Sequence, residues 1–487
     1  MNLDQSGIAL LVGYLCSLLF VGYFANRARR EASLKDYYLA GGSLGVVGMF
    51  FTLYATQYSG NSFFALPGKA YREGIMATAF IVGIMSVVLV YLTYAPRLHR
   101  IAKQQQFISV GDFIRWRYDN TALLVSVNTI FLVTLVTFIL GNLKAVGLLL
   151  DTATAGVIPP AAGIILVCLI MAIYETLGGM RSVVWTDIIQ GLMLMSGSLL
   201  IFVCLLFTRD DGVMNQPVQL LAATGNFFAQ PLLTMELISL IALFAFGAGV
   251  YPQAIQRVYA ARSVGVLKRS YLFMFFMPLI TTAPLFLIGM SATDWFPGLR
   301  GSDTEQVVIF AIGDLLEGGG YLRWLLPLYL GAAIAAIMST IDSGLLTMGS
   351  IVNKDIIAST RPGLTQSQLH QLGIVLTWTM IAMMAFLAIT LPNSIWSLLV
   401  LKLEIVIQVF PTLIAGVYGI ALKPRTLVAG LLCGCAAAIC LRWWPQLSPL
   451  SAIHPGIWAF GLNVCIIFIV HLLTLTRKPI ASSPGSL

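Results

Sequence analysis

Residues Leu53 to Gly74 read LYATQYSGNSFFALPGKAYREG, and this stretch decides the fold class. It lies in a hydrophobic span, yet it contains an unbroken run of small or polar residues: Thr56, Gln57, Tyr58, Ser59, Gly60, Asn61 and Ser62. An unsatisfied polar group in hydrocarbon costs several kcal/mol, so a lipid-facing helix cannot carry this run. A helix that breaks near Ser59 and Gly60 can carry it, because the freed carbonyls and hydroxyls then line a wet cavity. The alternative is an unbroken buried helix whose small polar residues pack against neighbouring helices.

The composition is that of an integral membrane protein. Of the 487 residues, 58% are hydrophobic and 10% are charged, whereas soluble domains average about 25% charged residues. The net charge of +8 does not indicate nucleic-acid binding, because the positive residues lie mostly in short loops, where they report topology. The seven cysteines lie mostly within apolar runs and lack the usual zinc-site spacing, so we interpret them as small buried hydrophobic residues.

Apolar windows long enough to cross a bilayer predict an all-α protein with about thirteen transmembrane helices. The first window is followed, not preceded, by arginines, so we interpret it as a retained helix rather than a signal peptide. The windows cover residues 7–25, 44–66, 75–95, 122–150, 158–177, 183–207, 237–259, 271–291, 322–351, 372–391, 395–422, 426–441 and 457–475.

Charges in the loops between these windows predict the topology. Alternate loops carry arginine and lysine, such as Arg97 after the third window, whereas the opposite loops carry acids such as Asp210 and Asp211. The positive-inside rule then places the N-terminus outside and the C-terminus in the cytoplasm. We expect residues 293–321 to form an extracellular loop or a short surface helix, and residues 481–487 to form a disordered tail.

A second polar patch lies in the window 322–351. Ala336, Ser339, Thr340 and Ser343 follow the spacing i, i+3, i+4 and i+7, which places three hydroxyls and one small residue on one helix face. Sodium prefers hard oxygen ligands, and hydroxyls together with the free carbonyls of a broken helix supply them. Asp342 lies in the same turn. Tight helix packing through small residues is the alternative reading of this spacing.

Asp187, in the sequence VVWTDIIQ, is an ionisable residue just inside the cytoplasmic end of a predicted span. Carboxylates within a membrane are costly and usually mark the path of an ion or a proton. The alternative is an interfacial side chain that simply reaches water.

Several spaced motifs resemble the sodium:solute symporter family, which includes bacterial sodium-coupled symporters of proline, pantothenate, sialic acid and galactose. They occur in order along nearly the whole chain: YYLAGGSLG, ATQYSGNSFFALPGKAYREG, YETLGGMRSVVWTDIIQ, AAIMSTIDSGLL and NKDI. The resemblance implies a single transmembrane domain over residues 1–480, with an amino-acid/sodium symporter-like core of two inverted five-helix repeats.

The same resemblance divides this domain. Residues 7–25 would form an extra first helix, 44–207 and 237–422 the two repeats, and 426–475 two peripheral helices. The windows that begin at Leu44 and Leu237 would be the two broken helices.

The resemblance also implies ion ligands. A sodium site shared across the family would take the backbone carbonyls of Ala55, Tyr58 and Ala336 and the hydroxyls of Ser339 and Thr340. A second sodium site, present in some members, would use Asp187, Ser339, Asp342 and Ser343. Asp342 departs from that pattern, because a neutral hydroxyl residue is usual there. The added carboxylate could strengthen ion binding or make the site protonatable, and both alternatives stay open.

Candidate solute-binding residues lie mainly on the two broken helices. Proline symporters carry Asp where this chain has Gln57, so proline is not implied. Lys144 lies near the outer end of a span, where it could reach water by snorkelling or face the cavity and suit an anion. The candidates are Gln57, Ser59, Asn61, Ser62, Phe246, Gly247, Tyr251, Gln253, Gln408 and Lys144.

These observations predict a transporter that imports a small polar solute together with sodium by alternating access. Half-helix N-termini favour anionic groups, so we expect a carboxylate-bearing solute such as an amino acid, a monocarboxylate or a pantothenate-like acid. A sodium-coupled sugar symporter and a transporter-like signalling module are the alternatives. An enzyme is not expected, because no His, Asp or Glu cluster has metal or acid–base spacing. Proton coupling, the number of sodium ions and the oligomeric state stay open.

Overall fold

The computed structural model describes residues 5–28, 33–154, 156–208, 231–317, 324–361, 363–391 and 395–476. Asp210, Asp211 and the predicted tail 481–487 lie outside these ranges. Helices dominate the described residues, and a single bridge between Leu44 and Ala261 is the only strand-like pairing within them. The predicted all-α fold class is therefore confirmed.

Eleven helical segments in the described residues are long and apolar enough to cross a membrane. A further pair, α11 (Pro231–Ala248) and α12 (Pro252–Ala260), bends by 48° at its break and raises the number to twelve. The predicted total of about thirteen is not confirmed. The spanning segments include α1 (Gln5–Arg27), α5 (Thr78–Gln105), α7 (Thr121–Ala153), α8 (Pro160–Gly178), α9 (Met180–Thr208), α13 (Val264–Trp295), α15 (Leu325–Ser350), α17 (Gln366–Thr390), α18 (Ile395–Val406) with α19 (Phe410–Val417), α20 (Pro424–Trp443) and α21 (Pro455–Thr476).

The predicted window 44–66 explains the difference in number. Its first half is α3 (Val46–Gln57), a helix of 12 residues that is too short to span a bilayer by itself. Its second half begins as a π-helix, η2 (Asn61–Ala65), and continues through α4 (Leu66–Glu73) into α5 as one helical run. The polar residues of the opening stretch thus lie at the break between α3 and η2.

Short helices connect several spanning segments. The segment predicted as an outer loop or surface helix contains η4 (Gly301–Gln306) and α14 (Val307–Glu317), so its described part is largely helical, but most of α14 is buried and does not lie on the surface. Three further short helices were not predicted: α2 (Leu34–Leu39), α6 (Val110–Tyr118) and α16 (Ala358–Thr360).

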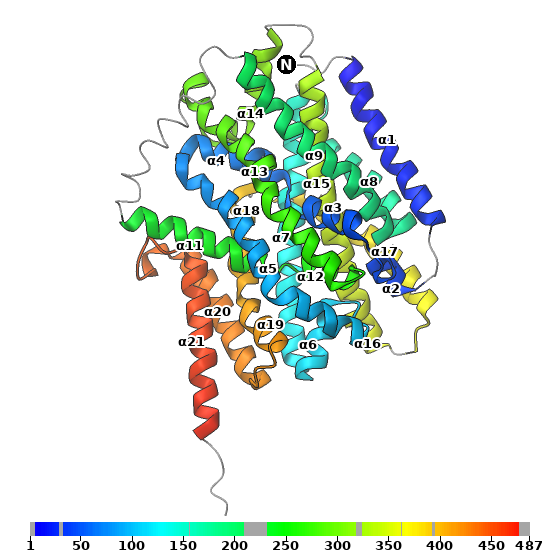
Figure 1. Cartoon of the computed structure of the whole chain (residues 1–487), viewed down its shortest axis with the longest axis vertical. Coiled ribbons are helices and arrows are strands. Elements are labelled where there is room, and N and C mark those ends of the chain that lie inside the picture. The colour runs from blue at the N-terminus through cyan, green and yellow to red at the C-terminus, as the bar shows by residue number, and fades with distance from the viewer. Residues whose placement is uncertain are drawn as a thin grey trace, which may run out of the picture.

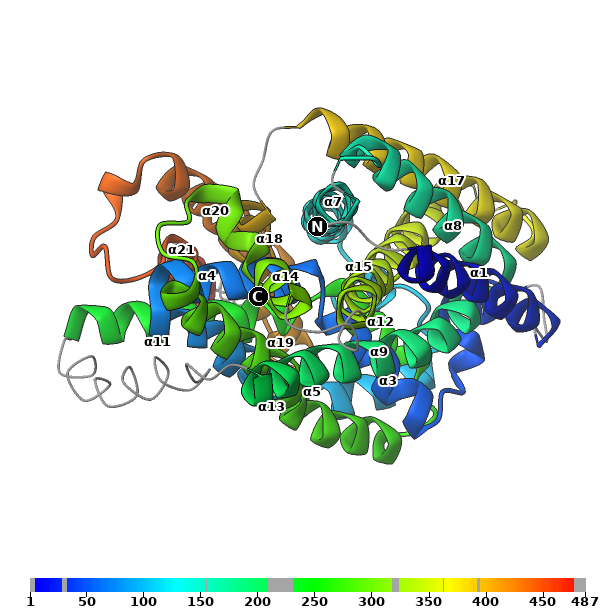
Figure 2. The same cartoon turned by 90° about the horizontal axis from the view of Figure 1, so that it is seen from above.

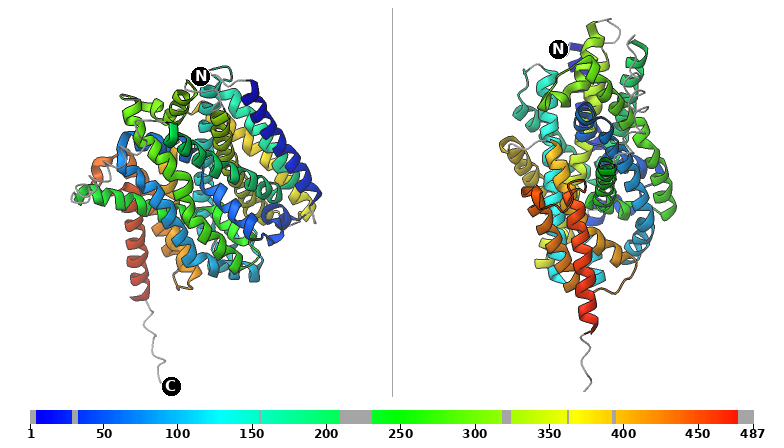
Figure 3. Two further views of the ribbon diagram at one scale, coloured as in Figure 1. Left: turned by 45° about the horizontal axis from the view of Figure 1, so that its top comes forward. Right: turned by 90° about the vertical axis from the view of Figure 1, so that its left-hand side faces the viewer.

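Helix α15 lies at the centre of the protein, and the first and last helices lie at its edges. Of the most apolar 18 residues of the α15 span, 94% are buried, against 28% for α1, 33% for α20 and 22% for α21. Figures 1 and 2 show α15 among α7, α9 and α12, with α1 on one flank and α20 and α21 on the other. The side views show α21 as the outermost helix, packed against α20 (Figure 3). The polar patch on α15 is therefore buried in protein and does not face lipid.

Candidate functional site

The first broken helix passes beside the middle of α15. Helix α3 ends at Gln57, and Tyr58 takes an extended conformation, with φ −98° and ψ 129°, before the chain turns into η2. The polar backbone groups at this break find partners on other helices, because none can stay unpaired in a membrane. The Gly60 amide donates to Asn142 Oδ1 of α7 at 3.0 Å, and the Tyr329 hydroxyl donates to the Phe63 carbonyl at 2.7 Å.

Gly60 permits the break to lie this close to α7 and α15. A Cβ atom at this position would come within 2.8 Å of the Ala145 Cβ and 3.0 Å of Ile337 Cγ1, which is too close for ordinary packing. Any larger residue would push the break away from α15, and the carbonyls of α3 would move with it.

The second broken helix is supported by two tyrosines of α5. Helix α11 ends at Ala248, and α12 begins at Pro252, which cannot donate a backbone hydrogen bond. The Tyr91 hydroxyl donates to the Ala248 carbonyl and the Tyr94 hydroxyl to the Gly249 carbonyl, each at 2.7 Å. Both tyrosines are fully buried. Sequence analysis missed them, since their role depends on a distant segment.

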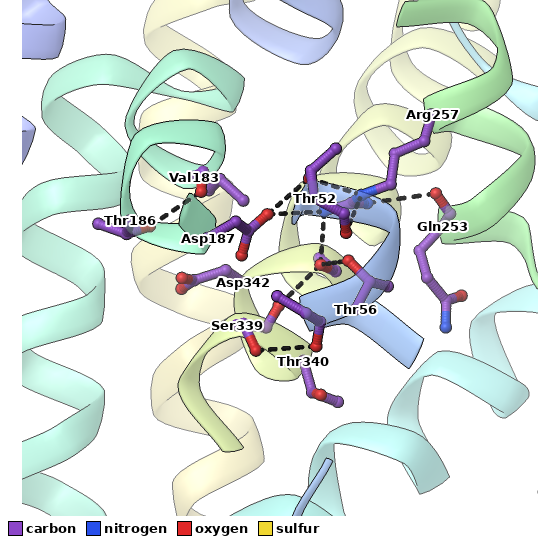
Figure 4. Close-up of polar contacts among 12 residues, drawn as sticks. Thr52, Thr56, Val183, Thr186, Asp187, Gln253, Arg257, Ser339, Thr340 and Asp342 are labelled. Carbon is purple, nitrogen blue, oxygen red and sulfur yellow. Dashed lines mark hydrogen bonds and ion pairs between the residues drawn. The ribbon is translucent and has the colours of Figure 1, made fainter. Parts of the chain in front are cut away.

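The residues predicted for the shared sodium site lie together where α3 breaks beside α15 (Figure 4). Ser339 Oγ lies 3.0 Å from both the Ala55 and the Ala336 carbonyl oxygens, and Thr340 Oγ1 lies 3.2 Å from the Tyr58 carbonyl oxygen. These five oxygens are hard donors without formal charge, and both hydroxyls are fully buried. This donor set fits a sodium ion carried as cargo, with the hydroxyl protons turned away from the ion.

Two of the residues predicted for a second sodium site, Asp187 and Ser343, are engaged by a buried arginine (Figure 4). Arg257 Nη2 donates to Ser343 Oγ at 2.5 Å and lies 3.8 Å from Asp187 Oδ2. Its Nε donates to Thr52 Oγ1 at 2.9 Å, and Thr52 Oγ1 in turn donates to Asp187 at 2.5 Å. Arg257 was not among the predicted site residues, and its side chain is fully buried on α12.

Asp342 points to another neighbour. Its Oδ2 accepts a hydrogen bond from the Tyr174 hydroxyl of α8, and its Oδ1 has no hydrogen-bond partner among the described residues. Glu175, the residue after Tyr174, is also fully buried, and neither of its carboxylate oxygens has such a partner. Asp342 thus lies on the α8 side of α15, while Asp187 and Ser343 pair with Arg257.

A small cavity lies next to the break of α3. It has a volume of about 20 Å³, which is room for about one water molecule. Among the residues that line it, Lys402 of α18 carries the only formal charge. The lining consists of Gln57, Ser59, Asn61, Phe80, Ile84, Phe138, Phe244, Ala248, Tyr251, Leu399 and Lys402. A larger cavity of about 360 Å³ between α8 and α17 is almost wholly apolar and lies away from these residues.

Four of the ten predicted solute-binding residues therefore line this cavity: Gln57, Ser59, Asn61 and Tyr251. Ser62 and Gln253 are buried nearby, where Ser62 Oγ accepts from the Ser59 amide and the Gln253 carbonyl accepts from Arg257. Neither belongs to the lining.

The other four predicted residues contact different parts of the protein. The Phe246 ring packs on Phe410 and Phe460, and Gly247 packs against Leu403. Gln408 accepts a hydrogen bond from Asn463 of α21 through Oε1 at 3.1 Å. The Lys144 amine donates to the Leu391 carbonyl, so this lysine does not line the cavity. Lys402, two residues from Glu404 in an apolar run, was the available sequence signal for the cavity cation.

Polar contacts join the segments at both ends of the site. Near α2, Arg181 pairs with Asp36 at 2.5 Å, and the Lys103 amine donates to the Gly42 carbonyl at 2.5 Å. Near α14, Arg72 donates to the Thr304 hydroxyl, and burial raises the pKa of Glu305 while the Arg72 charge lowers it. These contacts join residues outside the cavity lining, and none of them involves α15.

Known proteins resemble this chain in sequence and in fold. The sequence model of the sodium:solute symporter family matches residues 37–422. The high-affinity proline transporter PutP of Bacillus subtilis is 25% identical over 94% of this chain and 96% of its own length. The sodium/sialic acid symporter SiaT of Proteus mirabilis is 27% identical over 72% of this chain and 70% of its own. A solved substrate-bound, outward-open sodium-coupled sialic acid symporter has a TM-score of 0.80 at 20% identity, covering 99% of this chain and all of that one. The chain belongs to the sodium:solute symporter family, whose members are sodium-coupled membrane transporters.

Proposed function

We propose that this protein imports a small polar solute bearing a carboxylate, in symport with sodium, by alternating access. One observation carries the proposal: the candidate ion site and the candidate solute cavity share the break of α3. Ala55 and Tyr58 turn their carbonyls toward Ser339 and Thr340, while Gln57 and Ser59 line the cavity. An ion that orders this short segment also orders the cavity wall, which links sodium binding to solute binding.

In this proposal sodium binds to the carbonyls of Ala55, Tyr58 and Ala336 and the hydroxyls of Ser339 and Thr340. Asp187 and Ser343 are engaged by Arg257 in this conformation. A second sodium ion at Asp187, Asp342 and Ser343 would therefore require the guanidinium to move. We accordingly assign one sodium ion to the shared site as the minimal stoichiometry.

The charge of the cavity supports a carboxylate-bearing solute. Lys402 brings a buried amine to the lining, whose charged form an anionic group would stabilise, and no acidic residue lines the cavity within the described part of the chain. Burying an unpaired charge is costly, so an anionic group that pairs with Lys402 gains more than a neutral sugar hydroxyl does. Two relatives are named for proline and for sialic acid, and both of those solutes carry a carboxylate.

The proposed transport cycle uses the predicted repeats and orientation. Residues 44–207 and 237–422 would move as two inverted repeats, with the N-terminus outside and the C-terminus in the cytoplasm. The contacts near α2, between Asp36 and Arg181, would then close the cytoplasmic path. Those near α14, between Arg72 and Thr304, would close the outer path. Each set would open in turn while α15 stays in place.

The test is uptake into proteoliposomes that contain the purified protein. Radiolabelled amino acids, monocarboxylates, pantothenate and hexoses are offered with an inward sodium gradient, and again with potassium in place of sodium. We expect uptake of a carboxylate-bearing solute that needs sodium and that weakens in Ser339→Ala. Sodium-dependent uptake of a hexose, uncompeted by any carboxylate, would contradict the proposed solute class and favour the sugar symporter alternative.

A further inference from the structure

Lys402 has a setting that is unusual for a buried cation. Its side chain is 2% exposed, and its Nζ lies 3.7 Å from the ring centroid of Phe138 and 5.1 Å from that of Tyr251. Among the described residues it has no carboxylate partner and no hydrogen bond. Aromatic faces attract a cation more weakly than a hydrogen-bonded carboxylate does. Within the described part of the chain, the Lys402 amine therefore lies at the cavity wall without the carboxylate partner that would stabilise its charge most.

Three buried carboxylates, on α9, α15 and α18, are oriented toward other groups. Asp187 lies against Arg257, Asp342 accepts from Tyr174, and Glu404 pairs with Arg442 at 3.0 Å. None of these acids lines the cavity. An ammonium group on the solute would thus enter a cavity that already holds one cation and would find no carboxylate to pair with.

Asn61 indicates a second feature of the solute. Its Nδ2 donates to Ser59 Oγ at 3.0 Å, which leaves Oδ1 as a buried acceptor with no donor among the described residues. Buried acceptors are normally satisfied. A neutral hydroxyl on the solute supplies the missing donor without adding charge.

We infer that the transported solute is a small monocarboxylate without an ammonium group, whose carboxylate pairs with Lys402 and whose neutral hydroxyl, where it has one, donates to Asn61. This inference rests on the proposed function and narrows it from carboxylate-bearing solutes in general to this class. The apolar part of the cavity wall, formed by Phe80, Phe138 and Phe244, would contact the carbon chain of such a solute.

The experiment uses solutes that differ by one group. Lactate, alanine, propionate and lactamide have the same three-carbon chain. Compared with lactate, alanine has an ammonium in place of the hydroxyl, propionate lacks the hydroxyl, and lactamide has an amide in place of the carboxylate. Radiolabelled lactate uptake into proteoliposomes is measured with a sodium gradient, and each of the other three is added as a competitor. We expect lactate to be taken up, and alanine and lactamide to compete about tenfold or more weakly than unlabelled lactate.

Variants of Lys402 test whether this residue causes the preference for lactate over alanine and lactamide. In Lys402→Gln we expect the lactate concentration for half-maximal uptake to rise roughly 30-fold or more, because the buried counter-charge is lost. Lys402→Arg keeps the charge and should retain most of the affinity. Lys268→Gln, which removes an exposed lysine at the start of α13, is the matched control for lost charge. Elution of each variant as a single species in gel filtration distinguishes lost binding from misfolding.

The outcomes separate this inference from the proposed function. Sodium-dependent uptake of alanine or proline, uncompeted by lactate, would overturn the inference and leave the carboxylate symporter standing. Equal lactate uptake in Lys402→Gln and wild type would also overturn it. Sodium-dependent uptake of a hexose alone would overturn both, since the carboxylate class itself would then be wrong.

Discussion

Arg257 and Lys402 are both buried cations in the core of this transporter, yet their surroundings differ. The Arg257 guanidinium donates to Ser343, Thr52 and the Gln253 carbonyl and lies 3.8 Å from the Asp187 carboxylate. The Lys402 ammonium contacts two aromatic rings and has no hydrogen bond to any described residue. One cation is satisfied by the protein, and the other is left for something that enters the cavity.

The difference shows how a buried charge can be assigned to structure or to binding. A charge in a low-dielectric interior must be paired, because the cost of removing it from water is several kcal/mol. Arg257 meets this requirement within the chain and thereby joins α3, α9, α12 and α15. Among the described residues Lys402 is paired only with aromatic rings, so an anion that enters the cavity could still form an ion pair with it. Burial alone does not separate the two roles; the count of partners does.

The largest expected effect is on stability. Arg257→Met leaves Asp187 buried without its cation, and we expect it to lower the free energy of unfolding by about 3–5 kcal/mol. Lys402→Met removes a cation that no carboxylate needs and should leave stability unchanged or raised. Thermal unfolding of the two purified variants in detergent measures both. A similar loss in both would contradict the distinction drawn between the two cations.

Removing the whole pair should reverse most of that loss. We expect Asp187→Asn combined with Arg257→Met to be more stable than Arg257→Met alone by about 1–4 kcal/mol, because no unpaired buried charge remains. Asp36→Asn, whose partner is Arg181 rather than Arg257, is the control for a lost buried acid of an ion pair. A double variant no more stable than Arg257→Met would mean that Asp187 is not the charge that Arg257 neutralises.

Substitutions of the proposed sodium ligands should lower the affinity for sodium rather than the stability of the protein. Ser339→Ala and Thr340→Ala each remove one oxygen from the ion site, and we expect a cost of about 1–3 kcal/mol. This is an increase of about 5- to 150-fold in the sodium concentration for half-maximal uptake. Ser198→Ala, which removes a buried hydroxyl that bonds only the backbone of its own helix, is the control. Unchanged sodium dependence in both variants would remove these hydroxyls from the ion site.

The smallest expected effect concerns the cavity wall near Lys402. Tyr91→Phe leaves the Ala248 carbonyl without its donor at the break of α11, and the expected cost is about 1 kcal/mol. Tyr23→Phe, at an exposed tyrosine of α1, should be neutral. Thermal unfolding distinguishes them, and equal melting temperatures would show that the Tyr91 hydrogen bond contributes little to the broken helix.

Much of the fold was predictable because its signals are local. Eleven to twelve spanning segments of the described residues overlap the predicted apolar windows, and the run from Thr56 to Ser62 marks the break of α3. The predicted number of membrane spans is too high because α3, with 12 residues, is too short to cross a bilayer by itself. Likewise, the spacing of Ala336, Ser339 and Thr340 predicts a shared helix face, and the Ser339 and Thr340 hydroxyls do meet the carbonyls of Ala55 and Tyr58 at the break of α3.

The solute cavity was harder to predict, since it depends on which side chains from distant segments meet. Gln57, Ser59 and Asn61 line it as expected, because they belong to the break itself. Lys144 was the predicted cation, but its amine binds the Leu391 carbonyl. Lys402 takes that place from α18, more than 250 positions along the chain from Lys144. The residues next to Lys144 and Lys402 in the sequence do not determine which of the two side chains points into the cavity.

By itself, the sequence determined the membrane class, the helical architecture, the two breaks and the polar face of α15. These follow from hydropathy, helical periodicity, and the inability of lipid to satisfy polar groups. Only the tertiary structure decided the partners of the buried charges. It placed Arg257 beside Asp187 and Ser343, turned Asp342 toward Tyr174, and left Lys402 at the cavity. The physical reason is that a buried charge is stabilised by groups close in space, and those groups come from helices far apart in the chain.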